Sequence, residues 1–527
     1  MRNDDSKTLF SFRDIHKSII KAQETFTQAG LCKGDRVAII APHSPYAIIA
    51  GYALAYSNIT TVLIDVSLPI EEINRLLEFS DVRAVFTVSE TYDILDKNLV
   101  SDVPVFDLYK EGDYSVFVDS VKTTMKTETT DPHLDVIAIL YSSGTTASMK
   151  GVMIKYTSVL KSRELFLKFA GTTPEMTGLL PLPFNHIAGY NTALVHTLIG
   201  CELGLIEDVN APKLQKGLLE YQPSFFAIVP RVYELMEQKI RQAIHEKGEK
   251  TERKFYKALK LSSFLRRKFN INIGKKLFKE VTCKVFGENI YILGCGSSKC
   301  AESTSKFFLD LGLVWMNIYG LTETNFPASA TGVLDRYPVG NEGNVKHHKC
   351  IDIVIHNPDK DNIGEIRIKT ELIMKGYFRD EELTKSSFDE KDYFKTGDMG
   401  YIDKKGYLHV TGRLKETINL HTGKKVAPLD VENLYSKLNL NITIACVGVP
   451  NEVGTYDEVH LFIETGDLSE SKQAEIKQKI IEFSIDTSTI YQISKIHFVE
   501  KLPTTSVGKV KRFKLKEIAL AERNEVK

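Results

Sequence analysis

The alternation of strand-like and helix-like segments over the first 90 residues constrains the fold more than any other feature of this chain. Strand-like apolar runs at 34–41, 60–65 and 83–88 alternate with helix-like segments at 46–56 and 69–77. A strand followed by a helix and then by another strand is typical of a parallel β-sheet with helices packed on its faces. The sequence therefore predicts an α/β fold whose N-terminal part contains a layered parallel sheet.

The length of the chain and a change of pattern along it indicate several subdomains. At 527 residues the chain exceeds what a single hydrophobic core normally organises. After about residue 336 the pattern becomes strand-rich, with turn signals at 357–360, 362–364 and 404–406. We expect a small β-subdomain there that ends near Arg413. The residues beyond it mix strand-like segments with a helix-like segment at 469–483, which indicates a separate α+β part.

Composition excludes several classes of protein. The chain is 43% hydrophobic and 26% charged, and its formal net charge is zero, which is typical of a globular protein and not of a disordered chain or a general polyanion binder. We therefore expect no nucleic-acid partner. No apolar run approaches the 18 residues of a membrane span, and the polar N-terminus carries no evident signal peptide. The seven cysteines are odd in number and lack metal-ligand spacing, which favours free thiols and a cytoplasmic location.

The most informative local motif is a hydroxyl-rich loop between two apolar segments, at Ser142–Thr146. Its small residues offer backbone N–H groups and four side-chain hydroxyls, which suits phosphate oxygens, and Lys150 adds a nearby point charge. A Walker-type phosphate loop needs Gly-Lys-Ser/Thr leading directly into a helix, whereas here Met149 precedes the lysine and Gly151 follows it. The sequence therefore indicates a phosphate-binding loop of another class.

This loop resembles the phosphate-binding signature of the adenylate-forming (AMP-binding) acyl-activating enzyme superfamily, with Ala147 and Met149 where that family usually has Gly and Pro. Further segments resemble motifs of the same family and follow one another in the family's order. These segments are Pro181–Gly189, Asn317–Thr324, Tyr393–Asp398, Gly412–Glu416, Gly423–Glu432 and Leu502–Arg512. Subsidiary matches include Met374–Tyr377 with Thr384. The resemblance covers residues 10–515 of the chain, with ends that are approximate.

The resemblance implies both a fold and a chemistry. The fold is α/β, with a large N-terminal AMP-binding and acyl-binding domain at 1–413 and a small, mobile α+β C-terminal domain at 414–527. The chemistry is ATP-dependent activation of a carboxylic acid to an acyl-AMP, followed by formation of an acyl-CoA thioester. Adenylation is required because a carboxylate is a poor electrophile, so the protein must hold two anions together and stabilise the charge that develops between them.

The resemblance also assigns the metal and the nucleotide to individual residues. Glu323 is the expected Mg²⁺ ligand, with Ser142 as a second oxygen donor, because hard cations prefer oxygen. Thr322 is expected to hydrogen-bond the α-phosphate, and Asp398 the ribose hydroxyls with the help of Arg413. The implied ATP-binding residues are Ser142, Ser143, Gly144, Thr145, Thr146, Lys150, Gly296, Tyr319, Gly320, Asp398, Arg413 and Lys415.

Lys509 is the expected catalytic cation. It follows Gly508 in a segment of flexible composition, from which a long ammonium side chain reaches the carboxylate and the α-phosphate. Taken in isolation, the same lysine among its basic neighbours indicates only a solvated tail. The catalytic set implied by the resemblance is Lys509, Glu323 and Thr322, and Lys415 marks the hinge of the mobile domain.

The substrate side is assigned to His186, Gly294 and Gly423 by the same resemblance. A lone histidine beside apolar residues is more often a core residue than a catalytic one, and the family favours substrate positioning over proton transfer at His186. The segment Val229–Glu234 resembles one typical of long-chain acyl-CoA synthetases, although Pro230 also indicates an ordinary helix start. We therefore expect a medium- or long-chain fatty acid as the substrate.

Two other functions fit the motifs. The acyl group is transferred in some relatives to the phosphopantetheine of a carrier protein, which presents the same thiol arm as coenzyme A. No carrier-like segment is evident in this sequence, so a carrier protein would act in trans. A nucleotide-binding relative without turnover is the other possibility, because of Ala147 and Met149 in the loop. The joint presence of the residues expected for metal, ribose and catalysis argues against it.

Basic residues are concentrated at 241–284, where they alternate with apolar residues at helical spacing. The plainer interpretation is a solvated helical excursion whose long side chains cover apolar surface. The alternative is a weak attraction to anionic membrane surfaces or to phosphate-bearing substrates such as coenzyme A.

Overall fold

The computed structural model describes most of the chain. The described residues are 2–3, 9–108, 116–117, 135–143, 149–169, 171–206, 209–332, 335, 337–346, 349–422, 424–438, 440, 442–466, 468–505 and 509–525. The chain forms two compact units, one of Met1–Asp352 with Lys369–Phe388 and one of Ile353–Ile368 with Asp389–Lys527. The predicted domain boundary between 413 and 414 falls inside the second unit and stays a prediction.

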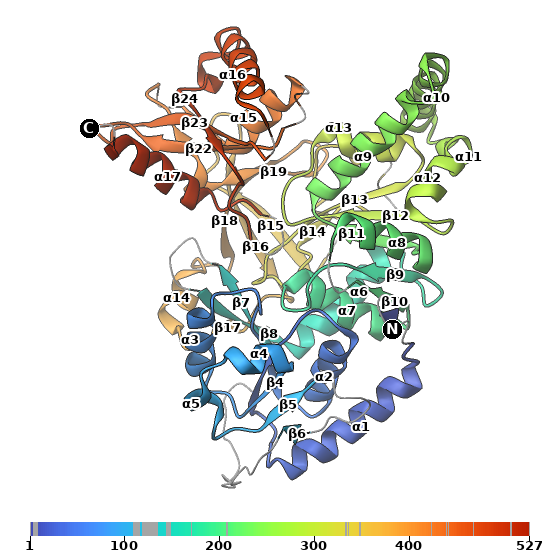
Figure 1. The fold of residues 1–527 in the computed structure, drawn as a ribbon, viewed down its shortest axis with the longest axis vertical. Helices are drawn as coiled ribbons and strands as arrows, with labels where there is room; N and C mark the ends of the chain where they lie inside the picture. The colour runs from blue at the N-terminus through green and yellow to red at the C-terminus, as the bar shows by residue number, and fades with distance from the viewer. Residues whose placement is uncertain are drawn as a thin grey trace. The chain divides into compact units, whose positions relative to one another are not determined.

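The first unit contains an eight-stranded sheet built largely from the N-terminal third of the chain (Figure 1). Its strands, in spatial order, are β17 (Gly376–Tyr377), β8 (Met149–Lys155), β7 (Val136–Ser143), β3 (Thr60–Leu63), β2 (Arg36–Ile40), β4 (Ala84–Thr87), β5 (Val105–Asp107) and β6 (Val116–Phe117). Strand β2 pairs in parallel with β3 and with β4. The predicted parallel sheet is therefore confirmed, and the observed bounds lie within a few residues of the predicted ones.

The second sheet of this unit has seven strands and supplies most of the candidate site. Its strands, in spatial order, are β1 (Arg2–Asn3), β10 (Glu202–Leu205), β9 (Thr177–Leu180), β11 (Phe225–Ile228), β12 (Ile292–Cys295), β13 (Val314–Tyr319) and β14 (Ser329–Ala330). Strands β9, β11, β12 and β13 are mutually parallel, so their carboxyl ends lie at one edge of the sheet.

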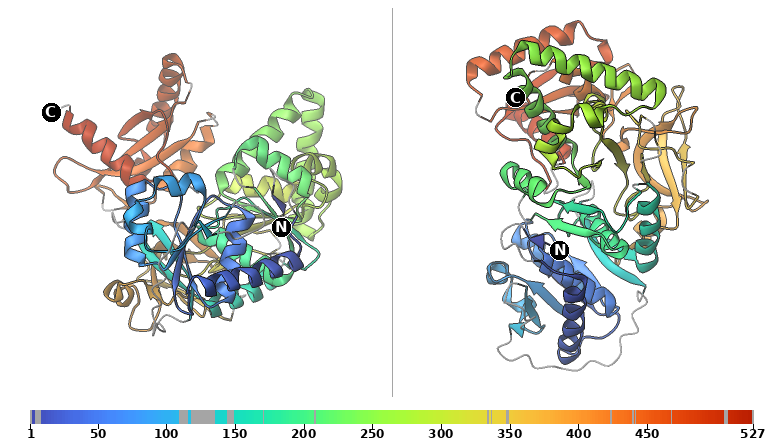
Figure 2. Two further views of the ribbon diagram at one scale, coloured as in Figure 1. Left: turned by 60° about the horizontal axis from the view of Figure 1, so that its bottom comes forward. Right: turned by 90° about the vertical axis from the view of Figure 1, so that its right-hand side faces the viewer.

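Helices cover and separate the two sheets of the first unit. They are α1 (Phe12–Gln28), α2 (Pro45–Tyr56), α3 (Ile70–Ser80), α4 (Ser89–Ile94), α5 (Lys97–Val100), α6 (Tyr156–Phe169), α7 (Ile187–Ile199), α8 (Ala211–Tyr221), α9 (Pro230–His245), α10 (Glu249–Phe269), α11 (Gly274–Leu277), α12 (Lys279–Phe286), α13 (Glu302–Asp310) and α14 (Glu381–Ser386). Figures 1 and 2 show α10 as a long helix on the outside of this unit. None of the helices among the described residues combines the length and apolar composition needed to cross a bilayer.

Aromatic packing fixes the part of the core that lies under the candidate site. The Trp315 ring on β13 contacts the ring of Tyr233, at a centroid distance of 4.8 Å, and stacks on Phe308 at 5.7 Å. The Tyr233 hydroxyl donates to the carbonyl oxygens of Phe226 and Gly294, both at 2.9 Å. Because large aromatic side chains bury much apolar area, this cluster holds α9 and α13 against β11, β12 and β13.

The second unit combines most of a four-stranded sheet with a smaller mixed region. The sheet consists of β15 (Ile351–His356), β16 (Gly364–Thr370), β18 (Phe394–Ile402) and β19 (Leu408–Arg413), so it ends at Arg413 as predicted. The remaining elements are η1 (Leu414–Glu416), β20 (Ile418–Asn419), β21 (Lys425–Val426), α15 (Pro428–Tyr435), η2 (Ser436–Leu438), β22 (Ile444–Pro450), β23 (Asp457–Glu464), α16 (Glu470–Ile485), η3 (Thr489–Tyr491), β24 (Lys495–Val499) and α17 (Arg512–Glu525). The predicted helix at 469–483 corresponds to α16.

Candidate active site

The carboxyl edge of the seven-stranded sheet brings several predicted site residues together. Gly296 follows β12, Gly320 follows β13, and Tyr319 is the last residue of β13. Ligand sites in α/β proteins form at the carboxyl ends of parallel strands, where loops from adjacent strands converge. The placement agrees with a nucleotide site at this edge, and the individual contacts of these residues stay predictions.

His186 lies in the turn that follows β9 and begins α7. Its Nδ1 accepts a hydrogen bond from the backbone N–H of Ala188 at 3.3 Å, so the ring caps this helix. A Cβ on Gly189 would lie 2.0 Å from the carbonyl oxygen of Pro183, so only glycine permits this tight entry into the helix. The observed contact of His186 is structural, and its role toward a substrate stays a prediction.

Glu323 and Thr322 lie in a turn that is tied to the helices between the sheets. The side chain of Asn325, at φ +47°, is fully buried in this turn. The Asn191 amide nitrogen on α7 donates to the Asn325 backbone carbonyl at 3.0 Å and to its side-chain oxygen at 3.1 Å, and Asn325 donates to Ser162 on α6 at 3.1 Å. These hydrogen bonds attach the turn to α6 and α7, so the turn presents Glu323 from a fixed base.

The predicted phosphate loop connects two paired strands of the eight-stranded sheet. Ser142 near the end of β7 lies directly opposite Lys150 near the start of β8 in the antiparallel register. Ser143 is described only through its backbone, which pairs with Met149. The predicted contacts Gly144, Thr145 and Thr146 lie outside the described residues, as does Ala147.

Tyr377 connects the phosphate-loop lysine to the expected metal ligand. Its hydroxyl donates to Glu323 Oε1 at 2.9 Å, and the Lys150 ammonium lies 5.2 Å from the centroid of its ring. Burial raises the pKa of the Tyr377 phenol well above its ordinary value, and the Glu323 carboxylate raises it further, so the phenol stays protonated and donates. The sequence motif contains this tyrosine, but motif reasoning assigned it no role because its partners lie far away in the chain.

A metal ion at Glu323 would need ligands beyond this carboxylate. The described residues contain no group of three or more His, Cys, Asp or Glu side chains arranged to hold a metal. Mg²⁺ is often bound through one or two carboxylates together with substrate phosphates. The carboxylate oxygens of Glu323 therefore fit Mg²⁺ if phosphate oxygens of a nucleotide complete its ligand set.

In the second unit, Asp398 and Arg413 form a pair across two adjacent strands. They lie opposite each other in the β18–β19 register, and Arg413 Nε donates to Asp398 Oδ1 at 2.8 Å. The Asp398 side chain is almost fully buried. The Thr396 hydroxyl accepts from the Asp398 N–H at 3.0 Å, which fixes the strand at this point. The predicted ribose-binding pair is thus in mutual contact, while its contact with ribose stays a prediction.

Lys509 lies near this pair within the same unit. Thr504 and Val510 form an antiparallel bridge, and the Thr505 N–H donates to the Lys509 carbonyl at 2.8 Å, so the backbone at Lys509 is paired with that at Thr505. Burial lowers the pKa of the Lys509 ammonium, and the positive charge of Arg413 lowers it further, whereas the carboxylates of Glu416 and Asp398 oppose the shift. Lys509 is therefore a partly desolvated cation whose charge interacts with those of Arg413, Glu416 and Asp398.

Arg512, three residues after Lys509, attaches this part of the chain to α15. Its Nη2 lies 2.8 and 2.9 Å from the two carboxylate oxygens of Glu432 on α15, and its Nε lies 3.5 Å from Glu416. Lys415, the predicted hinge and nucleotide contact, is exposed in η1. Gly423 lies outside the described residues, so its assignment stays a prediction.

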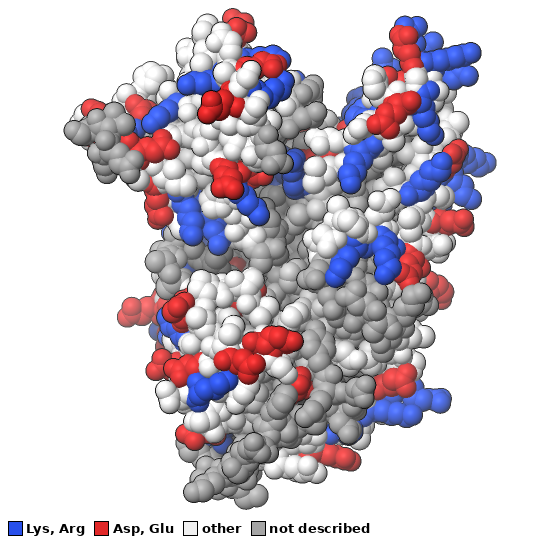
Figure 3. All heavy atoms as spheres, in the orientation of Figure 1, with Lys and Arg blue, Asp and Glu red and all other residues white. Residues whose placement is uncertain are grey.

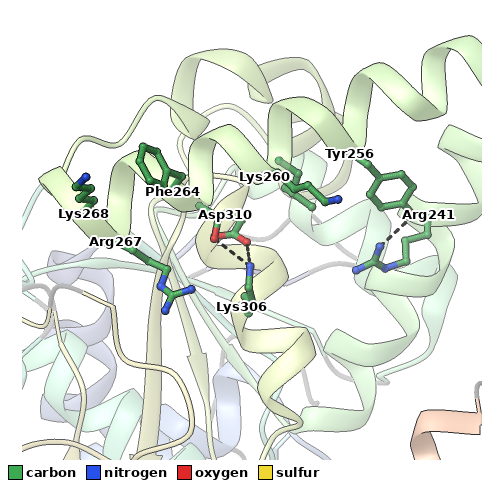
Figure 4. A pocket seen from close by; sticks show the side chains of 10 residues that line it. Arg241, Tyr256, Lys260, Phe264, Arg267, Lys268, Lys306 and Asp310 are labelled. Carbon is green, nitrogen blue, oxygen red and sulfur yellow. Dashed lines mark hydrogen bonds and ion pairs between the residues drawn. The ribbon is translucent and has the colours of Figure 1, made fainter.

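A second feature of the first unit is a basic cavity on the outer helices. Its volume is about 620 Å³, and its lining includes Arg241, Lys260, Arg267, Lys268, Lys306 and Asp310. Figure 4 shows Lys306 beside the buried Asp310, with Arg267 on the facing helix α10. Lysine and arginine side chains also gather on the outside of this helical region (Figure 3). Most of this lining belongs to the basic segment 241–284, and Lys306 and Asp310 of α13 complete it.

Comparison with known families places these residues in a wider context. The sequence profile of a family described as AMP-binding enzyme matches residues 3–378. The long-chain-fatty-acid–CoA ligase FadD13 of Mycobacterium tuberculosis (strain CDC 1551 / Oshkosh) is 24% identical over 508 residues, which cover 94% of this chain and 90% of that protein. The 2-succinylbenzoate–CoA ligase of Oceanobacillus iheyensis is 23% identical over 517 residues, covering 97% and 95%.

Solved structures resemble the fold over nearly its full length. ATP-bound MatB from Rhodopseudomonas palustris has a TM-score of 0.75 at 20% identity, and the match covers 98% of this chain and 95% of that one. The o-succinylbenzoate coenzyme A synthetase MenE from Bacillus subtilis, in complex with ATP and a magnesium ion, has a TM-score of 0.72 at 18% identity, with 98% and 96% covered. At these identities the likeness shows the fold alone, and it confirms the predicted α/β class.

Proposed function

The chain belongs to the AMP-binding enzyme family, and on that premise we propose that it is an acid–thiol ligase that forms an acyl-AMP from a carboxylic acid and ATP. The carboxylate attacks the α-phosphorus, pyrophosphate leaves, and a thiol then displaces AMP to give a thioester. The observation that carries the proposal is the linked arrangement of Lys150, Tyr377 and Glu323 beside the paired strands β7 and β8.

The first unit would hold the triphosphate. Lys150 and the hydroxyls of the loop that begins at Ser142 would bind the β- and γ-phosphates, and Glu323 would hold Mg²⁺. The metal ion would neutralise phosphate charge and so favour the approach of a second anion. Thr322 lies next to Glu323 in the turn, which supports its proposed contact with the α-phosphate. Tyr319 and the glycines Gly296 and Gly320 would line the adenine side.

The second unit would supply the ribose contact and the catalytic cation. Asp398 would accept hydrogen bonds from the ribose hydroxyls, and Arg413 holds this carboxylate at 2.8 Å. Lys509 would donate to the attacking carboxylate and the α-phosphate as charge moves between them. A cation that is partly removed from water interacts more strongly with such charge than a solvated one. Lys415 would permit rotation of the part that follows it.

We propose a medium- or long-chain fatty acid as the acid, and coenzyme A as the thiol. The segment Val229–Glu234 and the named activity of the mycobacterial relative support the fatty acid. The relative that acts on succinylbenzoate has a similar identity, so aromatic acids are the natural competitors. The substrate-side residues would be His186, Gly294 and Gly423. The seven cysteines are all free thiols, which supports a reducing, cytoplasmic setting.

We predict acid-dependent exchange of pyrophosphate into ATP in the presence of Mg²⁺. Aliphatic acids of increasing length and a set of aromatic acids should be compared, followed by coenzyme A and a phosphopantetheine carrier as acceptors. The expected result is exchange with a maximum at one range of aliphatic lengths, and thioester formation with coenzyme A. Exchange that responds only to aromatic acids would overturn the fatty-acid assignment. Bound ATP without exchange for any acid would overturn the ligase assignment.

We further propose weak peripheral contact between 241–284 and an anionic membrane surface, which would bring the enzyme to its amphiphilic substrate. Exposed apolar side chains alternate here with cations: Leu261, Phe264, Phe269 and Ile271 are each 50–53% exposed. Lys260, Arg267 and Lys268 are exposed beside them and line the cavity. A helix with interleaved cations and exposed apolar residues binds anionic bilayers in two ways: its cations are attracted to the anionic lipids, and its apolar side chains are buried in the membrane interface.

The membrane contact is tested by reversing charge on α10. The double variant Lys260→Glu/Lys268→Glu is expected to bind phosphatidylserine-containing vesicles at least about 30-fold more weakly, since each lysine near an anionic surface contributes about 1 kcal/mol and both contributions are lost. Lys17→Glu/Lys21→Glu on α1 changes the net charge equally and serves as the control. Cosedimentation that is equal for both double variants, or equal for neutral and anionic vesicles, would contradict the proposal.

A further inference from the structure

We propose that Tyr377 is a positioning residue that couples the metal ligand Glu323 to the phosphate-binding Lys150, so that Mg²⁺ and the triphosphate bind as one unit. This inference rests on the proposed function, which assigns Mg²⁺ to Glu323 and the phosphates of ATP to Lys150. Three segments meet at this tyrosine: strand β8 after the phosphate loop, the turn that carries Glu323, and β17 from the later segment 369–388.

The backbone of Tyr377 is held from two sides. Strand β17 pairs antiparallel with β8, so Tyr377 lies opposite Val152, two residues beyond Lys150. Its N–H donates to the Thr384 hydroxyl at 2.8 Å. A Cβ on Gly376, at φ +155°, would lie 2.9 Å from the Thr384 methyl carbon, so glycine is what permits this approach. These contacts explain why Gly, Tyr and Thr occur together in the motif.

The same segment is also attached to the turn that presents Glu323. The Met374 N–H donates to the backbone carbonyl of Glu323 at 2.7 Å, and the Tyr377 hydroxyl donates to its Oε1 at 2.9 Å. The backbone and the side chain of Glu323 are therefore both held by residues 374–377. One carboxylate oxygen accepts from the phenol, and no partner for Oε2 is present among the residues that the structure describes. This leaves the second oxygen for a cation.

The ring of Tyr377 faces the other charged group. The Lys150 ammonium lies 5.2 Å from the ring centroid, within the range at which an aromatic face attracts a cation. The tyrosine is 5% exposed, so these interactions occur in a largely desolvated place where they are stronger than in water. Tyr377 contacts the two groups of opposite charge that the nucleotide and its metal require.

The test separates the hydroxyl from the ring by two substitutions. Tyr377→Phe keeps the ring near Lys150 and removes the donor to Glu323, whereas Tyr377→Leu removes both. The dissociation constant of ATP should be measured by calorimetry with Mg²⁺ and with a chelator in its place. For Tyr377→Phe we expect the affinity for Mg-ATP to fall about 10-fold, and the affinity for metal-free ATP to change little. For Tyr377→Leu we expect the affinity for metal-free ATP to fall as well, by a few-fold.

Tyr52→Phe is the matched control, because Tyr52 is also buried and its hydroxyl donates to the Ala193 carbonyl at 2.9 Å, far from the site in sequence. We expect it to leave the ratio of the two dissociation constants unchanged. If Tyr377→Phe changes both constants equally, or neither, the proposed coupling is wrong. Thermal unfolding of each variant identifies a general loss of structure, which would lower both affinities together.

Failure of this inference is distinguishable from failure of the proposed function. If the wild-type protein exchanges pyrophosphate, and Tyr377→Phe has the same ratio of dissociation constants for Mg-ATP and metal-free ATP as the wild type, the ligase assignment stands and the coupling is wrong. If the wild-type protein shows no exchange, but Tyr377→Phe loses the Mg²⁺-dependent part of its affinity for ATP, the coupling stands and the ligase assignment is wrong.

Discussion

Replacing Lys509 by alanine is expected to lower acid-dependent ATP–pyrophosphate exchange by about 100- to 1,000-fold, the range found when one preorganised donor to developing charge is removed. The physical reason is the placement of this ammonium. It is partly buried beside Asp398 and Arg413, where its charge is less screened than that of a surface lysine. ATP binding by the first unit's phosphate site should change little, because Lys150 and Glu323 are untouched.

Lys501→Ala is the control for this variant, because Lys501 is exposed and lies in the same C-terminal segment. We expect it to retain the exchange rate of the wild type. Circular dichroism should show that both variants keep their secondary structure. Unchanged exchange in Lys509→Ala would rule out this lysine as the catalytic cation.

The pH profile supplies an independent check on the same residue. Burial lowers the pKa of Lys509 below the ordinary lysine value of 10.5. The ammonium donates only while protonated, so its contribution is present below its pKa and lost as the pH rises through it. If this group limits the exchange rate, the rate should decline as the pH is raised, and the midpoint of that decline should lie below pH 10.5. Residual exchange in Lys509→Ala should lack that decline.

Replacing Glu323 by glutamine is expected to lower exchange by about 100-fold at limiting Mg²⁺, with partial recovery as the Mg²⁺ concentration is raised. Glutamine keeps the shape and still accepts from Tyr377, but it removes the negative charge that a hard cation prefers. Hydrogen bonds and contacts to charged groups in a partly buried site contribute more than neutral ones, which sets the size of the effect.

The Glu323→Gln experiment measures initial exchange rates across a Mg²⁺ titration. Glu381→Gln is the control, since Glu381 is exposed in α14 of the same unit. A Mg²⁺ dependence that is the same in Glu323→Gln as in the wild type would contradict the assignment of the metal. Lys509→Ala should leave the Mg²⁺ dependence of exchange unchanged, whereas Glu323→Gln should shift it.

Local sequence patterns predicted many elements because their causes are local. The alternation that predicted β2, α2, β3, α3 and β4 reflects side-chain periodicity within each segment. The start of α9 at Pro230 and the cap of α2 by Ser44 follow from single residues. The hydroxyl-rich loop was recognised from its own residues, and the segment that carries Glu323 from its resemblance to a family motif, because each motif is contiguous in the chain.

The candidate site was predicted less completely, because its geometry depends on contacts between distant segments. The roles of Asp398, Arg413 and Lys509 came from a family resemblance, and their proximity within the second unit became visible only in the fold. His186 caps α7, a contact that a lone histidine in a motif does not reveal. Tyr377 received no role from the sequence, because its hydroxyl partner is 54 residues away.

The sequence by itself determined the α/β class, the approximate bounds of its elements and the contiguous motifs, since periodicity, caps and turn residues act within a few positions. The tertiary structure alone decided which of those motifs meet. The register of β17 on β8 places Tyr377 between Lys150 and Glu323, and that register depends on packing across the whole sheet. Pairings of this kind are non-local, and no local pattern encodes them.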